Sequence, residues 1–426
     1  MLVALRLSPL VRVYSRNKGM PVNIFDIPAE IKTTTRTPSL WLWGCILLLI
    51  TIVYLCIFLG FFSQYLSKNP YILWSELLLI PLLLWGGIFT FRLLLWNGSN
   101  LEEEYWNATR TDYYQALLQK GRVHLKLIDI KVKFPDISGN ATDAMNNYLL
   151  PVRYTPKFTH MSRYLAFSSL VHNINEKKQY EERMQSLFNK MMPELLEDIY
   201  THITLLPPGA MLTIISVFSD DLKLQLEKLW DKRFNLIFPF SNILFGNSVY
   251  ESLDSWLDEG QSEYIILIAA HLHGNELISD SIDNQSETII LLFGKNSERI
   301  ENKGLSFDSL YRPEIGWDGI DKSIIWGEVS CNNQLSGVLY SGLSDKEKND
   351  IVIKTSDFMS ESALMSFNYI NTADYLCLCE PVTEVLQIKY VKEFLEPGRY
   401  LLINKYHDSL IVSYFLTLAA DDKGGL

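Results

Sequence analysis

The sequence predicts two N-terminal transmembrane helices followed by an α/β cytoplasmic domain with a mixed, buried sheet. Residues 40–62 contain no charged side chain, and residues 71–96 contain only Glu76 and Arg92. After residue 97, apolar runs typical of strands alternate with amphipathic stretches typical of helices. The predicted division is a basic cytoplasmic N-terminus (1–39), a transmembrane hairpin (40–96), a helical or mixed membrane-proximal part (97–204) and an α/β domain (205–426).

The two apolar runs predict membrane spans at about 40–62 and 71–92. The first, LWLWGCILLLITIVYLCIFLGFF, is 23 residues long, enough to cross about 30 Å of hydrocarbon as a helix. In the second, Glu76 and Arg92 flank an uncharged centre, so each side chain can reach a headgroup region. A buried hairpin of a soluble protein is the alternative, but such long charge-free runs are rare there. The predicted membrane anchors are Trp41, Trp43, Trp74, Glu76, Pro81, Arg92 and Trp96.

The orientation follows from the basic residues near the spans. Six of them precede the first span, whereas Lys68 is the one basic residue between the spans. The positive-inside rule therefore places both termini in the cytoplasm of a bacterial inner membrane, with residues 63–70 outside. Met1 and Met20 both remain candidate translation starts.

The charge of the remaining chain excludes some classes of partner. Residues 97–426 carry 30 basic and 46 acidic residues, a net charge of −16. An acidic domain repels nucleic acid and the anionic inner leaflet, so no nucleic-acid partner is expected. The five cysteines are too few and too unevenly placed for a disulfide framework.

Alternating elements fill the cytoplasmic part. Apolar runs at 263–273 and 287–293 require a sheet that is covered on both faces. Residues 296–321, rich in Gly, Asp and Ser, are either an insertion or the boundary between two halves. The other predicted strands are 123–132, 211–218, 374–379, 400–404 and 409–416, and the predicted helices are 100–121, 175–202, 220–234, 250–260 and 382–395.

Two long segments resemble the thiolase / β-ketoacyl synthase family. The run ESLDSWLDEGQSEYIILIAAHLH, a polar loop and SETIILLFG resemble the middle of that fold, where a helix leads into two buried strands. The ending DYLCLCEPVTEVLQIKYVKEFLEPGRYLLINKYHDSLIVSYFL is similar to its final unit, and GVLYSGLSDKEKNDIVI to the helix and strand opening that half. The resemblance covers residues 205–416 and implies a thiolase-like fold.

The catalytic residues of that family are not matched. Active members use a cysteine at the start of a buried helix, together with two histidines. Here no cysteine lies between Cys56 and Cys331, and Cys379-Glu380-Pro381-Val382 stands where the family has a His-Gly pair. The resemblance therefore implies a degenerate domain with no catalytic residue to assign. With its two spans, the chain resembles uncharacterised inner-membrane proteins of bacterial type VI secretion clusters.

Other chemical candidates have simpler interpretations. His271 and His273 share one face of a strand but lack a third metal ligand at recognisable spacing. Cys377 and Cys379 are interpreted as small apolar residues, and the Asp254/Asp258/Glu259 cluster as solvated charge at a helix end. The sequence therefore predicts no metal site and no cofactor.

The polar loop 274–287 is the predicted protein-binding site, because long loops on rigid scaffolds often carry contacts. Its candidate residues are Asn275, Glu276, Asp280, Asp283 and Asn284. The predicted function is a non-catalytic accessory or adaptor protein of the inner membrane. Two alternatives stay open: an acyl-transferring or condensing enzyme of thiolase type with Cys331 as nucleophile, and an immunity or sensor protein whose functional part is the membrane hairpin, with Glu76, Pro81, Gly86 and Gly87.

Overall fold

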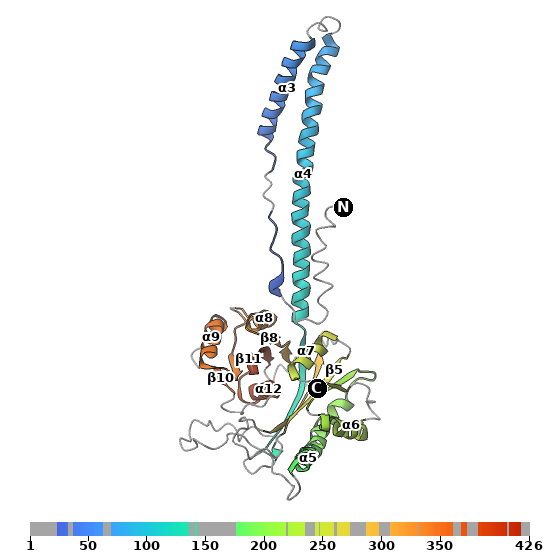
Figure 1. Cartoon of the computed structure of the whole chain (residues 1–426), viewed down its shortest axis with the longest axis vertical. Coiled ribbons are helices and arrows are strands. Elements are labelled where there is room, and N and C mark those ends of the chain that lie inside the picture. Colours follow the sequence, from blue (N-terminus) through green and yellow to red (C-terminus); the bar gives the residue numbers. More distant parts are fainter. Residues whose placement is uncertain are drawn as a thin grey trace. The chain divides into compact units, whose positions relative to one another are not determined.

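A computed structural model divides the chain into two compact units, Met1–Leu118 and Gln119–Leu426. Figure 1 shows the helices and strands of both units. The structure describes residues 24–32, 37–62, 70–135, 141–142, 176–218, 220–234, 243–246, 248–259, 262–272, 287–297, 307–330, 332–360, 368–372, 382–406 and 409–418.

The first unit contains a short 3-10 helix, η1 (Ile24–Asp26), and two long helices. Helix α3 (Leu40–Phe62) has the bounds predicted for the first span. Helix α4 (Pro70–Gly121) joins the second predicted span and the predicted helix at 100–121 into one 52-residue helix. Residues 97–118 of α4 therefore continue the helix for about 33 Å beyond the apolar run.

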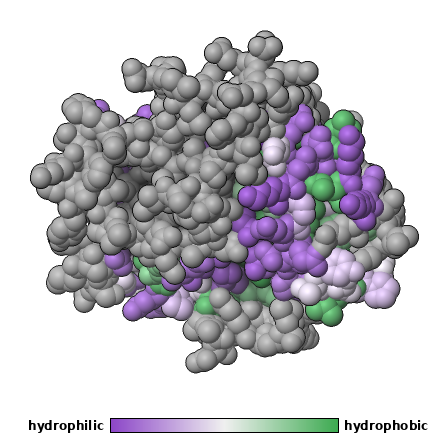
Figure 2. Space-filling model, turned by 90° about the horizontal axis from the view of Figure 1, so that it is seen from below, coloured by the Kyte–Doolittle hydropathy of each residue, from purple (hydrophilic) through white to green (hydrophobic). Residues whose placement is uncertain are grey.

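Both long helices expose their apolar side chains. The segments Leu40–Phe58 and Leu78–Gly121 each contain a strongly apolar window of which only 6% is buried. Both helices are long and apolar enough to cross a membrane. The described residues on the face of the molecule in Figure 2, in contrast, are mostly hydrophilic, with scattered hydrophobic ones.

Helices α3 and α4 run side by side and contact each other through aromatic residues (Figure 1). The Trp85 indole N–H donates to the Trp43 carbonyl oxygen at 2.8 Å. The Phe89 ring lies 5.1 Å from the Trp43 ring and 5.0 Å from the Trp85 ring. A Cβ atom added at Gly86 or Gly87 would meet nothing within 4 Å, so neither glycine serves a close helix contact within this chain.

The second unit is built on one mixed sheet whose main path is β10-β9-β11-β12-β7-β1-β6-β5-β3-β4. Strand β2 pairs with β1, and β8 pairs with β12. The strands are β1 (His124–Pro135), β2 (Ala141–Thr142), β3 (Leu212–Val217), β4 (Ile243–Phe245), β5 (Tyr264–His271), β6 (Thr288–Asn296), β7 (Asp308–Tyr311), β8 (Glu314–Ile315), β9 (Gly337–Ser341), β10 (Tyr369–Asn371), β11 (Gly398–Tyr406) and β12 (Ser409–Thr417).

The sheet consists of two halves with the same topology. The first half (residues 119–297) has the strand order β4-β3-β5-β6-β1, and the second half (307–418) has the order β10-β9-β11-β12-β7. In each, three parallel strands are followed by two antiparallel pairings. Strands β1 and β7 pair antiparallel and join the halves.

Helices cover the sheet in both halves. They are α5 (Glu176–Thr204), α6 (Asp220–Phe234) and α7 (Val249–Glu259) in the first half, and α8 (Asp318–Trp326), α9 (Asp345–Thr355), the 3-10 helix η6 (Ser356–Phe358) and α12 (Thr383–Phe394) in the second.

Three hydrophobic cores separate the layers. The central core combines α7 and α12 with one face of each half of the sheet. The outer face of the first half packs against α5 and α6, and that of the second half against α8 and α9. Along β5, Ile265 and Leu267 face the central core, whereas Ile266 and Ile268 face α5 and α6. This alternation explains why the strands are apolar throughout: both faces are covered.

The structure confirms the predicted α/β class and most predicted elements. The division predicted at residue 205 falls between α5 and β3 of the first half. The 296–321 region contains β7 and β8, which begin the second half. The segment expected as a helix followed by a strand is a strand followed by a helix, β9 and α9. The strand predicted at 374–379 lies outside the described residues.

Candidate functional site

A layer of buried polar side chains lies between α12 and the second half of the sheet. Helix α12 buries Glu384 and Gln387 as completely as its apolar residues Leu386 and Ile388. Because the helix is covered on several sides, its polar side chains must find partners inside the protein. We call this group the polar layer and define it as Ser341, Thr372, Glu384, Gln387, Asn404 and Ser413.

Gln387 is the centre of the polar layer. Its side-chain N–H group donates to the Thr372 hydroxyl oxygen at 2.9 Å, and its side-chain oxygen accepts from the Asn404 amide at 2.9 Å. The Thr372 hydroxyl in turn donates to the Tyr340 carbonyl oxygen at 3.1 Å. These bonds tie α12 to the ends of β9, β10 and β11.

Two atoms of the polar layer have no hydrogen-bond partner among the described residues. They are Oδ1 of Asn404 and Oγ of Ser341, both buried. The two residues are direct partners in the parallel pairing of β9 and β11. Both lie near the carboxyl ends of parallel strands, where α/β proteins place ligand sites. The pair offers a free acceptor and a free hydroxyl to a small polar group.

Glu384 is a buried carboxyl group in the same layer. Its carboxylate oxygen accepts a short hydrogen bond from the Ser413 hydroxyl. Burial raises the pKa of Glu384, and the Ser413 hydrogen bond opposes that shift. The net shift makes the charged form of this carboxyl group less favourable inside the protein than in water.

The start of α7 lies next to the end of β11. The rings of Tyr250 in α7 and Tyr406 in β11 stack at 6.4 Å, which brings the two halves together. Ser248 precedes the helix, and its hydroxyl oxygen accepts the Glu251 backbone N–H at 3.3 Å as an N-cap. Helix α7 is buried through Val249, Leu253 and other apolar side chains. No cysteine lies near the start of this buried helix, since the sequence has none between Cys56 and Cys331.

The chemical groups of the polar layer are those of its six defined residues. It contains hydroxyls, amides and one carboxyl group whose pKa is raised, and no thiol or imidazole. In the parts of the chain that the structure describes, no group of three His, Cys, Asp or Glu residues could hold a metal ion. The sequence did not single out this layer; the one local signal is the polar Asn404 within the apolar strand β11.

Several predicted site residues lie outside the described residues. They include all five residues of the predicted protein-binding loop, Asn275, Glu276, Asp280, Asp283 and Asn284, together with His273, Cys331, Cys377 and Cys379. His271 is the last residue of β5 and is half-buried.

The prediction of solvated charge at Asp254 and Asp258 is wrong. Arg312 is buried between them, with its Nε 3.0 Å from Asp254 and a short ion pair to Asp258. Lys120 adds a contact to Asp258 at 3.4 Å. The cluster joins α7 to the link between β7 and β8, which the sequence could not show because Arg312 is distant from α7 in the chain.

The predicted membrane anchors lie on α3 and α4. Trp41 has 81% of its surface exposed, and Trp43 contacts α4. Pro81 lies inside α4, while Arg92 and Trp96 are half-buried on the same helix. Trp74 and Glu76 belong to α4, but their side chains lie outside the description.

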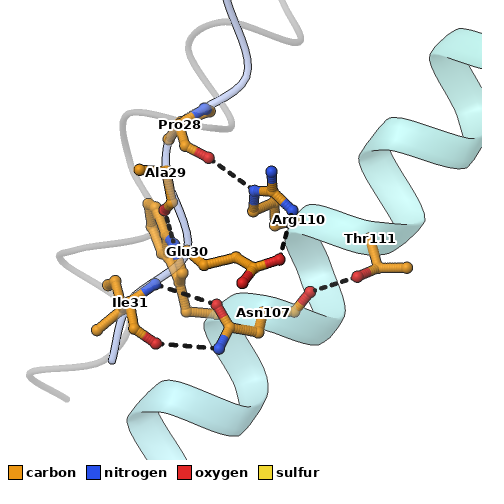
Figure 3. Close-up of polar contacts among 8 residues, drawn as sticks. Pro28, Ala29, Glu30, Ile31, Asn107, Arg110 and Thr111 are labelled. Carbon is orange, nitrogen blue, oxygen red and sulfur yellow. Dashed lines mark hydrogen bonds and ion pairs between the residues drawn. The ribbon is translucent and has the colours of Figure 1, made fainter. Parts of the chain in front are cut away.

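Residues 28–31 are clamped to α4 by side chains of that helix (Figure 3). The Asn107 amide donates to the Ile31 carbonyl oxygen at 3.1 Å and accepts the Ile31 N–H at 3.2 Å. Arg110 donates to the Pro28 carbonyl oxygen at 2.7 Å, and Trp106 to that of Ala29 at 3.3 Å. The segment before the first long helix therefore lies beside the part of α4 that follows the apolar run.

Comparisons with known proteins find likenesses only among solved structures, since no family model and no curated protein matches the chain. It is similar to a variant of OleA from Xanthomonas campestris, with 8% identity, a TM-score of 0.41 and coverage of 69% of this chain and 98% of that one. A chain of the AntDE:AntF complex, a type II PKS acyl-carrier protein with its ketosynthase, gives 12% identity, a TM-score of 0.45 and coverage of 70% and 100%. The chain is also similar to 3-oxoacyl-acyl-carrier-protein synthase III from Aquifex aeolicus, with 11% identity and a TM-score of 0.36. That match covers 68% of this chain and 99% of the other. These likenesses concern the path of the chain and say nothing about a shared activity.

Proposed function

We propose that the chain is a two-span protein of the bacterial inner membrane whose thiolase-like cytoplasmic unit binds a protein partner and performs no catalysis. The observation that supports the loss of catalysis most directly is the start of α7. The resemblance implies a nucleophilic cysteine at the start of a buried helix, whereas the start of α7, a helix buried in the central core, has Ser248, whose hydroxyl oxygen caps the helix.

Two observations support the membrane hairpin. The apolar side chains of α3 and α4 are exposed along most of their length, which soluble proteins avoid. The contacts of Asn107 and Arg110 with residues 28–31 support an arrangement in which the segments that flank the hairpin lie on one side of the membrane. If the chain crosses the membrane twice between these segments, both segments lie on the same side and can make this contact.

The distribution of basic residues supports a cytoplasmic location of that shared side. The acidic charge of residues 97–426 opposes contact with anionic lipid and favours partners with basic surfaces. The resemblance to proteins of type VI secretion clusters makes a component of that system the first partner to test. The loop residues Asn275, Glu276, Asp280, Asp283 and Asn284 remain our proposed contact.

Copurification from cells in mild detergent tests partner binding. The full-length protein is compared with a variant in which the five loop residues are replaced by Ser, and the bound proteins are identified by mass spectrometry. We expect one protein to copurify with the wild type and to be lost from the loop variant at an unchanged melting temperature.

A matched control replaces two exposed acidic residues elsewhere, Asp345→Asn and Asp350→Asn in α9. This variant should keep the partner. Retention of the partner by the loop variant would refute the loop assignment, whereas loss from both variants would point to general charge rather than to the loop.

Labelling with a thiol-reactive acyl analogue tests the absence of catalysis. Peptide mapping after treatment of the full chain should show no selective modification of Cys331. Selective and stoichiometric acylation at that residue would revive the condensing-enzyme alternative and would contradict a non-catalytic role.

A further inference from the structure

A row of polar side chains crosses four neighbouring strands where the two halves of the sheet meet. Lys295 of β6 is the direct partner of Tyr264 in β5 and of Lys126 in β1, and Lys126 is also the partner of Ser309 in β7. Direct partners on adjacent strands point to the same face of a sheet. Because Tyr264 belongs to the core under α5 and α6, the row lies on that outer face.

The two lysines of this row face each other, and no acid in the described part of the chain compensates them. Lys295 is only 4% exposed, and none of the described carboxylates forms an ion pair with Lys295 or Lys126. The pKa of Lys295 is lowered, chiefly by burial and further by the charge of Lys126. Like charges directly opposite each other destabilise a sheet, so this arrangement is unfavourable by itself.

Other buried lysines in the same unit do have a carboxylate. Lys133 lies 3.2 Å from Glu194, and Lys322 lies 3.4 Å from Glu314. Lys295 instead holds its ammonium group 3.9 Å from the centroid of the Phe307 ring. A cation–π contact compensates only part of the cost of burying a charge. Among the described residues of this strongly acidic protein, no acid balances the two adjacent lysines, which favours completion of the site by an anion from outside.

We propose that Lys295 and Lys126, with the Ser309 hydroxyl beside them, form a binding site for a phosphate group. Adjacent strands are about 4.8 Å apart, so one tetrahedral anion can contact both ammonium groups through different oxygens. A phosphate carries close to two negative charges at neutral pH and so matches two lysines. Ser309 is available because its hydroxyl makes only a long hydrogen bond, 3.3 Å, to the Phe307 carbonyl oxygen. This site is separate from the polar layer, which lies between α12 and the second half of the sheet.

Thermal unfolding and calorimetry of the full chain in detergent, with inorganic phosphate added at constant ionic strength, test this site. The wild type should bind phosphate and unfold at a higher temperature in its presence. Lys295→Met keeps the length of the side chain and removes the charge, so it should weaken phosphate binding at least tenfold. Lys126→Met should also weaken it, by a smaller factor, because Lys126 is more exposed.

Lys133→Met is the matched control, because Lys133 is similarly buried in the same sheet but is paired with Glu194. This variant should respond to phosphate as the wild type does. Without phosphate, Lys295→Met should unfold at the same temperature as the wild type or a higher one, since it removes an uncompensated buried charge. A lower unfolding temperature would indicate that the cation–π contact is the whole role of Lys295, and would overturn the site.

A second arm of the experiment separates two sources of phosphate. Short-chain phosphatidic acid is added in place of inorganic phosphate, and the same variants are compared. A Lys295-dependent response to inorganic phosphate supports a soluble ligand, and one confined to phosphatidic acid supports a lipid headgroup. The absence of any response, or an equal response in Lys295→Met, refutes the site.

Discussion

The two halves of the sheet share one topology but differ in the side chains that they place toward the central core. At the ends of the paired parallel strands, the first half has Val217 opposite Ala269, whereas the second half has Ser341 opposite Asn404. Helix α7 packs through Val249, Leu253 and other apolar residues, whereas α12 contributes both apolar side chains and the polar groups of the polar layer.

This difference shows that the topology does not need polar groups in the central layer. The first half builds the same strand order with an apolar interface, so the polar layer of the second half is an addition to the fold. The first half also buries charge, but in a closed pair on its outer face. Arg183 donates to both carboxylate oxygens of Glu287, at 2.6 and 2.9 Å. The Arg183–Glu287 pair is thus closed within the protein, whereas Ser341 Oγ and Asn404 Oδ1 of the polar layer have no hydrogen-bond partner among the described residues.

The largest loss of stability is expected when the buried ion pair between Arg183 and Glu287 is broken. Glu287→Ala leaves the buried Arg183 guanidinium without this carboxylate and should cost about 3–5 kcal/mol of unfolding free energy. Chemical denaturation of the full chain in detergent measures it. The double variant Arg183→Met/Glu287→Leu should recover most of that loss, because a matched apolar pair carries no uncompensated charge. A similar loss in the double variant would show that the pair is not the cause.

A smaller loss of stability is expected when a buried polar residue of α12 is replaced by the apolar residue found at the same position of α7. Leu253 is the fifth residue of α7, and Gln387 is the fifth of α12. Gln387→Leu removes the partner of the Asn404 amide and should cost about 2–3 kcal/mol in the same denaturation experiment. Adding Asn404→Leu should restore stability to within about 1 kcal/mol of the wild type. If the double variant is less stable than Gln387→Leu, the polar layer is needed for the fold.

Because Ser341 Oγ has no hydrogen-bond partner among the described residues, replacing this residue should change the free energy of unfolding little. Ser341→Val gives the second half the residue found at Val217, and it removes a buried hydroxyl that has no partner. Its unfolding free energy should stay within about 1 kcal/mol of the wild type, on either side. A loss of 2 kcal/mol or more would show that the hydroxyl has an internal partner in solution.

The smallest predicted effect is a pH-dependent change in stability that comes from Glu384. Because burial raises the pKa of Glu384 above its ordinary value, its stabilising contribution is complete below about pH 4.5 and declines as the pH rises through the shifted pKa. Glu384→Gln should therefore gain stability relative to the wild type between pH 5 and pH 8. Unfolding temperatures over that range measure the difference.

Glu347 provides a control of opposite sign in the same half. Hydrogen bonds from Lys405 and Ser344 lower the pKa of Glu347 to about 2. Its contribution is present above pH 4.5 and is lost as the pH falls toward 2. Glu347→Gln should therefore lose stability at neutral pH and approach the wild type in acid. The same pH trend in both variants would contradict the two opposite shifts.

Much of the fold was predictable because hydrophobic patterns are local. Helices α3 and α6 have the predicted bounds, and β3, β5, β6, β11 and β12 lie within a few residues of prediction. The break expected between the second span and the helix at residue 100 is absent: Gly98 and Ser99 continue α4, and the Ser99 hydroxyl bonds to the Leu95 carbonyl oxygen. Gly and Ser are weak helix formers, but they do not by themselves end a helix that is stabilised on both sides.

The candidate site was not predictable to the same degree. Gln387, Thr372 and Asn404 come from three separate elements, and only the folded sheet brings them together. The buried Arg312 was missed for the same reason, since its acidic partners lie more than fifty residues away in the chain. Sequence patterns thus predicted which faces are buried, but not which polar groups meet inside.

The location of the two spans is tested most directly by labelling intact spheroplasts with a membrane-impermeant maleimide. Ser67→Cys places a thiol between the two helices, while the native cysteines provide the internal reference. Modification at position 67 before lysis, with Cys331, Cys377 and Cys379 modified only after lysis, is the result that the account predicts. Labelling of those three cysteines in intact spheroplasts, or recovery of the protein in the soluble fraction, would contradict it.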